Sequence, residues 1–290
     1  MNIGIYKPGK CVYFYENEFD HASWSIEVTQ IAKLFVSKGH HVIMLSDTDL
    51  IPSEHLTTVI DRPIDRIYVF NGVGLTDDIL EGLKRYTSDI RLIVTDLKLI
   101  PTNLTPYSHI YTQSKQLYEY GAIQEGILFG VKQPEYGPFK DINIYFGGTE
   151  RNRLNDCIEY LWRPDVIWKG KSEFFGFNNY IPYHEHINML KRTKYTIIIG
   201  DESYNSIGFV TPRFYECALY GVIPFVDTKF DPNELILPHG HFLRVSSYRE
   251  MMQKIDKLNN DSVSKNSILM YLSLLCIEKK SGLNILEKII

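Results

Sequence analysis

The residues with the clearest chemical potential follow one apolar, strand-like run in the second half of the chain. The stretch from Ile197 to Glu216 reads IIIGDESYNSIGFVTPRFYE and passes directly from apolar to acidic, aromatic and basic residues. Arg213 stands three positions before Glu216. A guanidinium can bind phosphate oxygens through parallel hydrogen bonds, and a carboxylate can accept hydrogen bonds from sugar hydroxyls. The pair could therefore bind a nucleoside diphosphate, or it could form an ordinary ion pair on a helix surface.

The elements that must position these residues are a strand and the helix that follows it. Residues 195–199 (YTIII) are mostly β-branched, which is typical of a parallel strand buried on both faces. Open α/β sheets bind ligands outside the carboxyl ends of such strands. We therefore expect Asp201 and Tyr204 at the mouth of a crevice, with Arg213 and Glu216 opening the next helix.

The same alternation of strands and helices runs through both halves of the chain. In the first half, the patterns predict strands at 2–6, 42–45, 66–70 and 91–94, and helices at 24–38 and 76–86, the first ending at Gly39 and the second capped by Thr76. In the second half, they predict strands at 142–146, 165–168, 195–199 and 222–226, and helices at 152–162, 185–191, 213–219 and 247–258. Residues 263–290 are mostly helical by pattern.

Length and a proline-bearing passage divide the chain into two α/β domains. The 290 residues are about right for two such units. The polar passage 131–140 (VKQPEYGPFK) interrupts the periodicity and is the best linker candidate. We predict Rossmann-like domains at 1–135 and 136–262, with a helical segment at 263–290 that packs back on the first domain. The α/β fold class expected is GT-B, in which two Rossmann-like domains face each other across a cleft.

Composition and missing motifs exclude several classes of protein. A hydrophobic content of 44% indicates a globular protein with a full core, and no apolar run reaches the roughly 18 residues of a membrane helix. We therefore expect a cytoplasmic protein with no membrane partner and no obligate protein partner. The net charge of −4 argues against a general polyanion-binding surface, although a local basic cleft is compatible with it. The first strand is followed by YKPGKC, without the glycine fingerprint of dinucleotide-binding dehydrogenases.

Metal and disulfide frameworks are not indicated by the sequence. The cysteines, at positions 11, 157, 217 and 276, are widely separated and form no C-x-x-C pair. His184 and His186 flank Glu185, but we expect them on different faces of a helix start rather than as metal ligands. No D-x-D pair follows a strand in the second half. A magnesium or manganese ion is compatible with this sequence without being required by it.

Four separated motifs resemble the DNA β-glucosyltransferases of T-even phages. They are VTDLKLIP at 94–101, IYFGGTERNR at 144–153, Ile181-Pro182, and IIGDESYN at 198–205 followed by TPRFYE at 211–216. Their order and approximate spacing are those of the family, which is a GT-B glycosyltransferase family. The resemblance is strongest over residues 90–101 and 142–231.

The resemblance implies roles for two residues of the first domain. Asp96 matches the family's catalytic base, and an inverting sugar transfer needs a carboxylate to remove the proton of the attacking hydroxyl. An alternative is that Asp96 only caps the following turn. Glu27 occupies the position of a glutamate that lines the sugar and acceptor pocket, or it lies on a solvated helix face.

The resemblance also implies a donor-binding set in the second domain. Glycines at 147 and 148 allow close approach of a phosphate, and Thr149 can donate its hydroxyl. Arg151 and Arg153 match two diphosphate-binding arginines, although the loop is about two residues shorter than in the family. Glu150 adds a negative charge that works against an anion.

The remaining matches concern the nucleoside and the sugar. Ile181 matches the residue whose backbone recognises uracil, or it is an ordinary core isoleucine. Asp201 and Tyr204 match residues near the diphosphate and sugar, while Arg213 matches a phosphate ligand and Glu216 a ribose ligand. One extra residue between Tyr204 and Arg213 marks where donor identity could change.

Together these matches imply an inverting transfer of a sugar, glucose or a pentose such as arabinose, from a UDP-sugar. The implied acceptor is the hydroxymethyl group of a modified pyrimidine, such as 5-hydroxymethylcytosine, in double-stranded phage DNA. The enzyme would have to flip that base out of the duplex. Two alternatives stay open: a UDP-sugar transferase with a non-DNA acceptor, and a nucleotide-sugar-binding relative without turnover.

Overall fold

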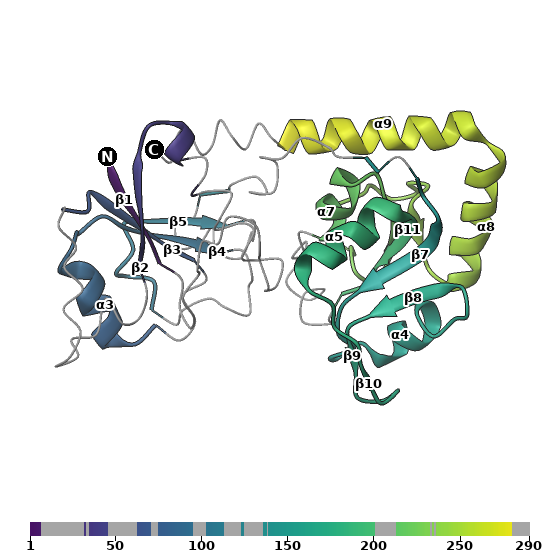
Figure 1. The fold of residues 1–290 in the computed structure, drawn as a ribbon, viewed down its shortest axis with the longest axis horizontal. Coiled ribbons are helices and arrows are strands. Elements are labelled where there is room, and N and C mark those ends of the chain that lie inside the picture. Colours follow the sequence, from purple (N-terminus) through teal and green to yellow (C-terminus); the bar gives the residue numbers. More distant parts are fainter. Residues whose placement is uncertain are drawn as a thin grey trace. The chain divides into compact units, whose positions relative to one another are not determined.

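The computed structural model consists of two compact units, and their described residues lie within Met1–Leu128 for the first and within Phe129–Ile290 for the second (Figure 1). The described residues are 1–6, 32, 35–45, 63–70, 75–94, 103–112, 123–124, 136–137, 139–200, 213–232, 234 and 236–279. For residues 112, 123–124, 183 and 276–279, only the backbone is described.

The first unit is built on one parallel sheet. Its strands are β1 (Asn2–Tyr6), β2 (His41–Leu45), β3 (Arg66–Phe70), β4 (Ile90–Val94), β5 (His109–Thr112) and β6 (Ile123–Gln124). They lie in the order β2-β1-β3-β4-β5-β6, and each neighbouring pair is parallel. The middle strands are almost wholly buried, as expected for parallel strands covered on both faces.

Two local signals fix helix ends in this unit. Helix α3 (Asp77–Lys84) begins after Thr76, whose side chain accepts a 3.3 Å hydrogen bond from the Ile79 N–H, as an N-cap should. Gly39 has a φ of 81° and its N–H donates to the carbonyl of Val36 at 3.0 Å, which ends the helical residues before it. Both ends lie where the sequence predicts them.

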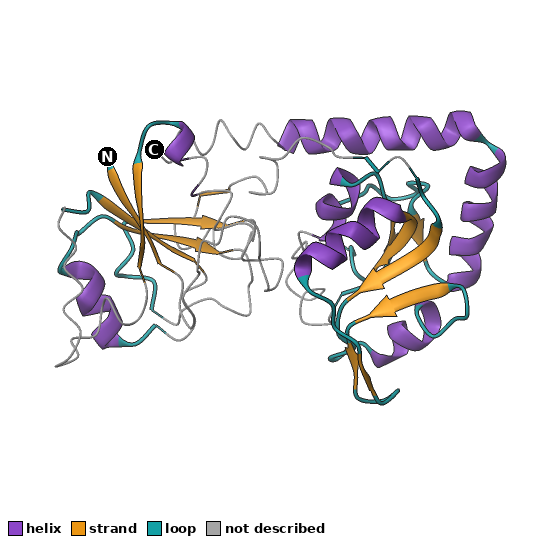
Figure 2. Ribbon diagram, viewed as in Figure 1, coloured by secondary structure: helices purple, strands orange, loops and turns teal. Residues whose placement is uncertain are grey.

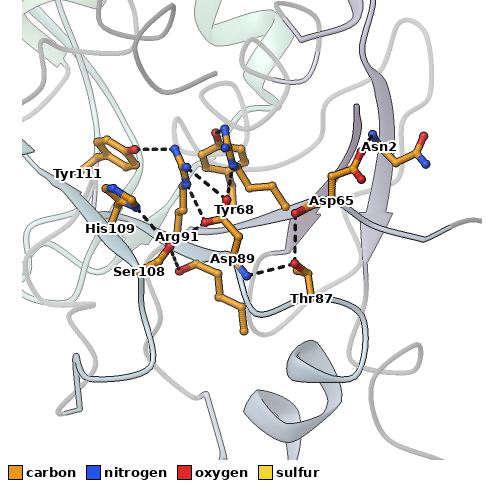
Figure 3. A network of polar contacts seen from close by, with 11 residues as sticks. Asn2, Asp65, Tyr68, Thr87, Asp89, Arg91, Ser108, His109 and Tyr111 are labelled. Atoms are coloured by element: carbon orange, nitrogen blue, oxygen red, sulfur yellow. Dashed lines mark hydrogen bonds and ion pairs between the residues drawn. The ribbon is translucent and has the colours of Figure 1, made fainter.

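A polar network joins the amino ends of β3, β4 and β5 (Figure 3). Asp89, just before β4, accepts hydrogen bonds from Arg66 Nε at 2.7 Å, Arg91 Nε at 2.9 Å and Ser108 Oγ at 2.8 Å. Arg91 also donates from Nη1 to the Tyr111 hydroxyl at 3.0 Å. Burial acts to raise the pKa of Asp89, but the hydrogen bonds from Arg91, Arg66 and Ser108 outweigh it and hold that pKa well below its ordinary value. The network therefore ties three strands together through one ionised carboxylate.

The second unit contains a five-stranded parallel sheet with helices packed around it (Figure 2). The strands are β7 (Ile142–Gly147), β8 (Val166–Lys169), β11 (Thr193–Ile198), β12 (Ile223–Asp227) and β13 (Arg244–Val245), in the order β13-β12-β11-β7-β8. The helices are α4 (Leu154–Tyr160), α5 (Tyr183–Arg192), α7 (Arg213–Leu219), α8 (Tyr248–Asn260) and α9 (Ser262–Lys279). A short antiparallel hairpin, β9 (Lys171–Ser172) with β10 (Phe177–Asn178), follows β8.

Both sheets have the same strand order over their first five strands. In chain order, the first strand of each unit lies between the second and the third, as β1 lies between β2 and β3, and β7 between β8 and β11. This is the 2-1-3-4-5 order of doubly wound sheets. The second strand lies on one side of the first strand, and the third and later strands lie on its other side. Ligands bind such sheets outside the carboxyl ends of the strands at that switch point. In the second unit, those ends are Gly147 on β7 and Ile198 on β11.

The alternation predicted from sequence is confirmed for the described elements, with ends shifted by a few residues. The patterns missed β5, β6, β13 and the β9–β10 hairpin, because each has at most four residues and no long apolar run. Residues 24–38 lie largely outside the described residues. Among the described helices, none is long and apolar enough to span a membrane.

Candidate functional site

The turn after β7 is the point at which the predicted donor residues converge. Gly148 N–H donates to the Lys169 carbonyl at 2.8 Å, and the Trp168 indole N–H donates to the Gly148 carbonyl at 2.8 Å. These bonds fix the turn against the end of β8. A Cβ placed at Gly148 would lie 3.0 Å from Arg213 Nη1 and 3.2 Å from Arg153 Nη2. Glycine at this position therefore lets two guanidinium groups approach the backbone.

Arg153 spans the switch point between β7 and β11. Its Nε and Nη2 donate to the Thr149 carbonyl at 3.0 and 2.6 Å, and its Nη1 donates to the Ile199 carbonyl at 2.7 Å. A planar guanidinium suits this geometry because its N–H donors point outward in a fixed fork. The cation is therefore held at the carboxyl edge of the sheet, before any ligand binds.

Arg213 reaches the same turn from the first residue of α7. Its Nη1 donates to the Gly147 carbonyl. Its Cζ lies 4.9 Å from the centroid of the Phe146 ring, and the Cζ of Arg153 lies 5.2 Å from the same centroid. A cation within about 6 Å of an aromatic face is attracted to it. Phe146 thus supports both guanidiniums, and sequence reasoning missed it although it immediately precedes the glycine pair.

The other predicted residues of this turn are placed differently. Arg151 has an exposed side chain and a φ of 44°, which is uncommon for a residue other than glycine. Thr149 is partly exposed. The structure therefore gathers Gly148, Thr149, Arg153 and Arg213 at one edge and leaves Arg151 on the solvent side of the turn.

Glu150, which lies between Thr149 and Arg151 in the turn, contacts the β9–β10 hairpin. Its side chain is buried and accepts hydrogen bonds from the Ser172 hydroxyl and, at 3.3 Å, from the Phe174 N–H. The carboxylate therefore anchors the β9–β10 hairpin. Sequence reasoning considered only the charge of Glu150 and missed this contact with the hairpin.

A cluster of three polar side chains, Tyr145, His186 and Glu216, lies next to the glycine turn. The hydroxyl of Tyr145 on β7 lies 2.7 Å from His186 Nδ1 on α5, and His186 Nε2 lies 3.6 Å from Glu216 Oε2 on α7. Burial raises the pKa of Tyr145, so its hydroxyl stays protonated. Glu216 is itself buried. His186 was considered in the sequence only as a metal ligand, and its contact with Tyr145 could not be read from the sequence because 41 positions separate them.

The segment before α5 is anchored at the end of β8. The Asn179 side chain accepts from the Gly170 N–H at 2.7 Å and donates to the Trp168 carbonyl at 3.2 Å. Ile181 follows two residues later and is partly exposed, not part of the core.

Several predicted site residues lie outside the described residues. They are Asp96, Glu27, Asp201 and Tyr204. Within the described parts of the chain, no group of three or more His, Cys, Asp or Glu side chains could hold a metal ion.

The overall fold matches solved glucosyltransferases. The chain aligns with the DNA-modifying enzyme β-glucosyltransferase, solved with and without uridine diphosphoglucose, with a TM-score of 0.72, 18% identity and 99% of each chain covered. It aligns with the T4 phage protein solved with UDP and Mn²⁺ at a TM-score of 0.70 and 18% identity, again over 99% of each chain. No protein-family model and no curated protein matches the sequence. The resemblance carried by the motifs therefore extends to the fold of the whole chain, and the GT-B fold class is confirmed.

Proposed function

We propose that this chain is an inverting glycosyltransferase that moves a sugar from a UDP-sugar to the hydroxymethyl group of a modified pyrimidine in double-stranded DNA. The observation that carries the proposal is the convergence of Arg153 and Arg213 on Gly148, at the switch point of a sheet. Two cations and a glycine backbone in this position suit a diphosphate. The structures with the same fold were solved with UDP or UDP-glucose.

The second unit would bind the donor. Arg153 and Arg213 would contact the diphosphate, with Gly148, Thr149 and the exposed Arg151 beside them. Ile181 would present its backbone to uracil and Glu216 would accept from the ribose hydroxyls. Asp201 and Tyr204 would contribute near the sugar. We assign residues 136–262 to donor binding and 1–135 to the acceptor, with Glu27 in the acceptor pocket.

The chemistry would be a single displacement. Asp96 would take the proton of the acceptor hydroxyl while its oxygen attacks the anomeric carbon, and the bond from that carbon to the diphosphate would break. The charge that develops on the departing UDP would be stabilised by Arg153 and Arg213. A magnesium or manganese ion is compatible with this chemistry without being required by it, and one structure with the same fold was solved with UDP and Mn²⁺.

The proposed acceptor is supported by likeness of fold and motif, since one structure with the same fold is that of a DNA-modifying enzyme. The modified base would be flipped out of the duplex to expose its hydroxyl. We place the reaction in the cytoplasm of an infected bacterial host. The sugar is glucose or a pentose such as arabinose.

The proposal is tested by incubating the protein with radiolabelled UDP-sugars and duplexes that contain 5-hydroxymethylpyrimidines. We expect acid-precipitable label on the DNA, and we expect Asp96→Asn to bind the donor while transferring about 10² to 10⁴ times more slowly. Label on a different acceptor, with none on any hydroxymethylated duplex, would favour a non-DNA transferase. UDP binding without turnover in either protein would favour a binding protein.

A further inference from the structure

His186 lies between two buried groups that come from different elements of the second unit. Tyr145 on β7 is 1% exposed and Glu216 on α7 is 4% exposed. His186 on α5 approaches both, with Nδ1 2.7 Å from the Tyr145 hydroxyl and Nε2 3.6 Å from Glu216 Oε2. One imidazole thus links the strand that ends at the glycine turn to the helix that carries Glu216.

This group packs directly against the turn that Arg213 contacts. A Cβ placed at Gly147 would lie 2.7 Å from His186 Nδ1 and 2.8 Å from the Tyr145 hydroxyl oxygen. Arg213 donates to the carbonyl of the same glycine. Any movement of the imidazole would therefore disturb both the carboxylate and the backbone that faces the arginines.

The contacts favour one arrangement of the imidazole protons. A neutral imidazole carries one N–H and one acceptor nitrogen. When Tyr145 donates to Nδ1, the ring hydrogen lies on Nε2, which faces Glu216. The opposite tautomer would turn a lone pair toward a carboxylate 3.6 Å away. A protonated ring also has a hydrogen on Nε2, so in either charge state His186 presents N–H to Glu216.

We propose that His186 is a positioning residue that holds Glu216 in the orientation needed to accept hydrogen bonds from the nucleotide ribose. The inference rests on the proposed function, because it takes Glu216 as the ribose ligand. An ionised carboxylate offers about four acceptor sites on its two oxygens. An interaction with His186 at Oε2 is therefore compatible with hydrogen bonds from ribose. His186 itself touches no reacting atom.

The neighbouring histidine provides a matched control. His184 lies two positions earlier on α5 and its side chain is exposed. Side chains two positions apart on a helix point to different faces. The variant His184→Ala therefore removes a histidine from the same helix but leaves the contact between His186 and Glu216 in place.

The test compares two ligands by isothermal titration calorimetry: UDP, and 2′,3′-dideoxy-UDP, which lacks the ribose hydroxyls. We expect His186→Ala to weaken UDP binding about 5-fold, because the 3.6 Å contact with Glu216 is longer than a hydrogen bond and orients the carboxylate electrostatically. Binding of the dideoxy ligand should change by less than about 2-fold, since the interaction that is lost involves the missing hydroxyls. His186→Gln, which keeps an N–H donor, should recover most of the UDP affinity, and His184→Ala should bind both ligands as the wild type does.

Two results would overturn the role of His186. One is UDP affinity in His186→Ala equal to that of the wild type, and the other is an equal loss for both ligands, which would indicate general damage to the site. Should His186→Ala fail to fold by circular dichroism, Tyr145→Phe carries the test, because it removes the hydroxyl that fixes the tautomer. That variant should lose UDP affinity about 3-fold with no loss for the dideoxy ligand, and an equal loss for both would again overturn the role. Failure of the wild type to bind UDP would instead refute the proposed function itself.

Discussion

Arg153 donates a 2.7 Å hydrogen bond from Nη1 to the backbone carbonyl of Ile199, and so joins the turn after β7 to the end of β11. The bond crosses the point at which the strand order of the sheet reverses. Because the guanidinium is already fixed there, binding an anion would not require this long side chain to lose much further conformational freedom. The site is preorganised by backbone carbonyls that every residue type supplies.

Replacing Arg153 should weaken nucleotide binding strongly. We expect Arg153→Ala to reduce UDP affinity about 10- to 100-fold, the range for hydrogen bonds to charged groups. Arg153→Lys should recover little, because an ammonium cannot span Thr149 and Ile199 in the same plane. Calorimetric titration with UDP measures both effects.

The matched control is Arg192→Ala. Arg192 pairs with Asp141 at the surface, and their side chains are 55% and 54% exposed. Such an exposed pair contributes little to stability. UDP affinity should be unchanged in this variant, and equal affinities in Arg153→Ala and the wild type would contradict the assignment.

Phe146→Leu should weaken UDP binding as well as lower the free energy of unfolding, because the ring contacts both arginines in addition to the core. The ring lies 4.9 Å from Arg213 Cζ and 5.2 Å from Arg153 Cζ. Loss of the ring should lower the free energy of unfolding by about 1 to 2 kcal/mol and weaken UDP binding several-fold. Phe225→Leu on β12, another buried phenylalanine, should cost similar stability but leave UDP affinity unchanged. Similar UDP affinities in the two variants would argue against a role for the ring in binding.

Asp89→Asn should remove a pH-dependent part of the stability. The folded-state pKa of Asp89 lies well below its ordinary value. Its contribution is therefore complete above the unfolded-state pKa near 4 and is lost as pH falls through the folded-state pKa. We expect the variant to be less stable by roughly 2 kcal/mol at pH 7, after allowance for partial exposure, and the difference to shrink below about pH 4. Urea denaturation of both proteins from pH 3 to 7 measures it, and a difference that does not vary with pH would contradict the prediction.

Lys140→Met should change how the free energy of unfolding depends on pH in the alkaline range. Lys140 donates to the Tyr220 carbonyl at 2.6 Å, and burial lowers its pKa to about 8. Between about pH 8 and the ordinary lysine pKa near 10.4, the unfolded chain binds more protons at this site, so stability from this group rises with pH. Below about pH 8, the folded state bears the cost of burying the charge. The wild type should therefore gain roughly 1 to 2 kcal/mol over the variant between pH 8 and 10. Urea midpoints measured side by side report this difference, and parallel pH profiles would refute it.

The sequence predicted much of the fold because its signals are local. Runs such as Arg66–Phe70 fill a doubly covered strand, and Thr76 caps the helix that follows it. The two-residue strands of the β9–β10 hairpin gave no such signal. Glu150 anchors this hairpin through Ser172. The role of Glu150 was predicted from the residues next to it in the chain, which do not reveal this contact.

The candidate site was partly predictable for the same reason. The glycine pair and the arginines could be named from motifs, because each motif is contiguous. The contacts of Phe146 with two guanidiniums, and of His186 with Tyr145 and Glu216, join distant parts of the chain. Such contacts are set by packing of α5 and α7 against the sheet, which periodicity does not specify.

The close approach of Gly170 to the turn limits how this protein can be redesigned. A Cβ at Gly170 would overlap the Gly148 carbonyl oxygen, so any larger residue would displace the backbone at the arginines. At the tip of the same hairpin, a Cβ at Gly176 would meet no neighbouring atom, but its φ of 68° lies in the left-handed region that favours glycine. A combinatorial library built to alter ligand preference should therefore keep Gly170 and Gly176 constant and randomise exposed residues of the tip such as Glu173 and Phe174.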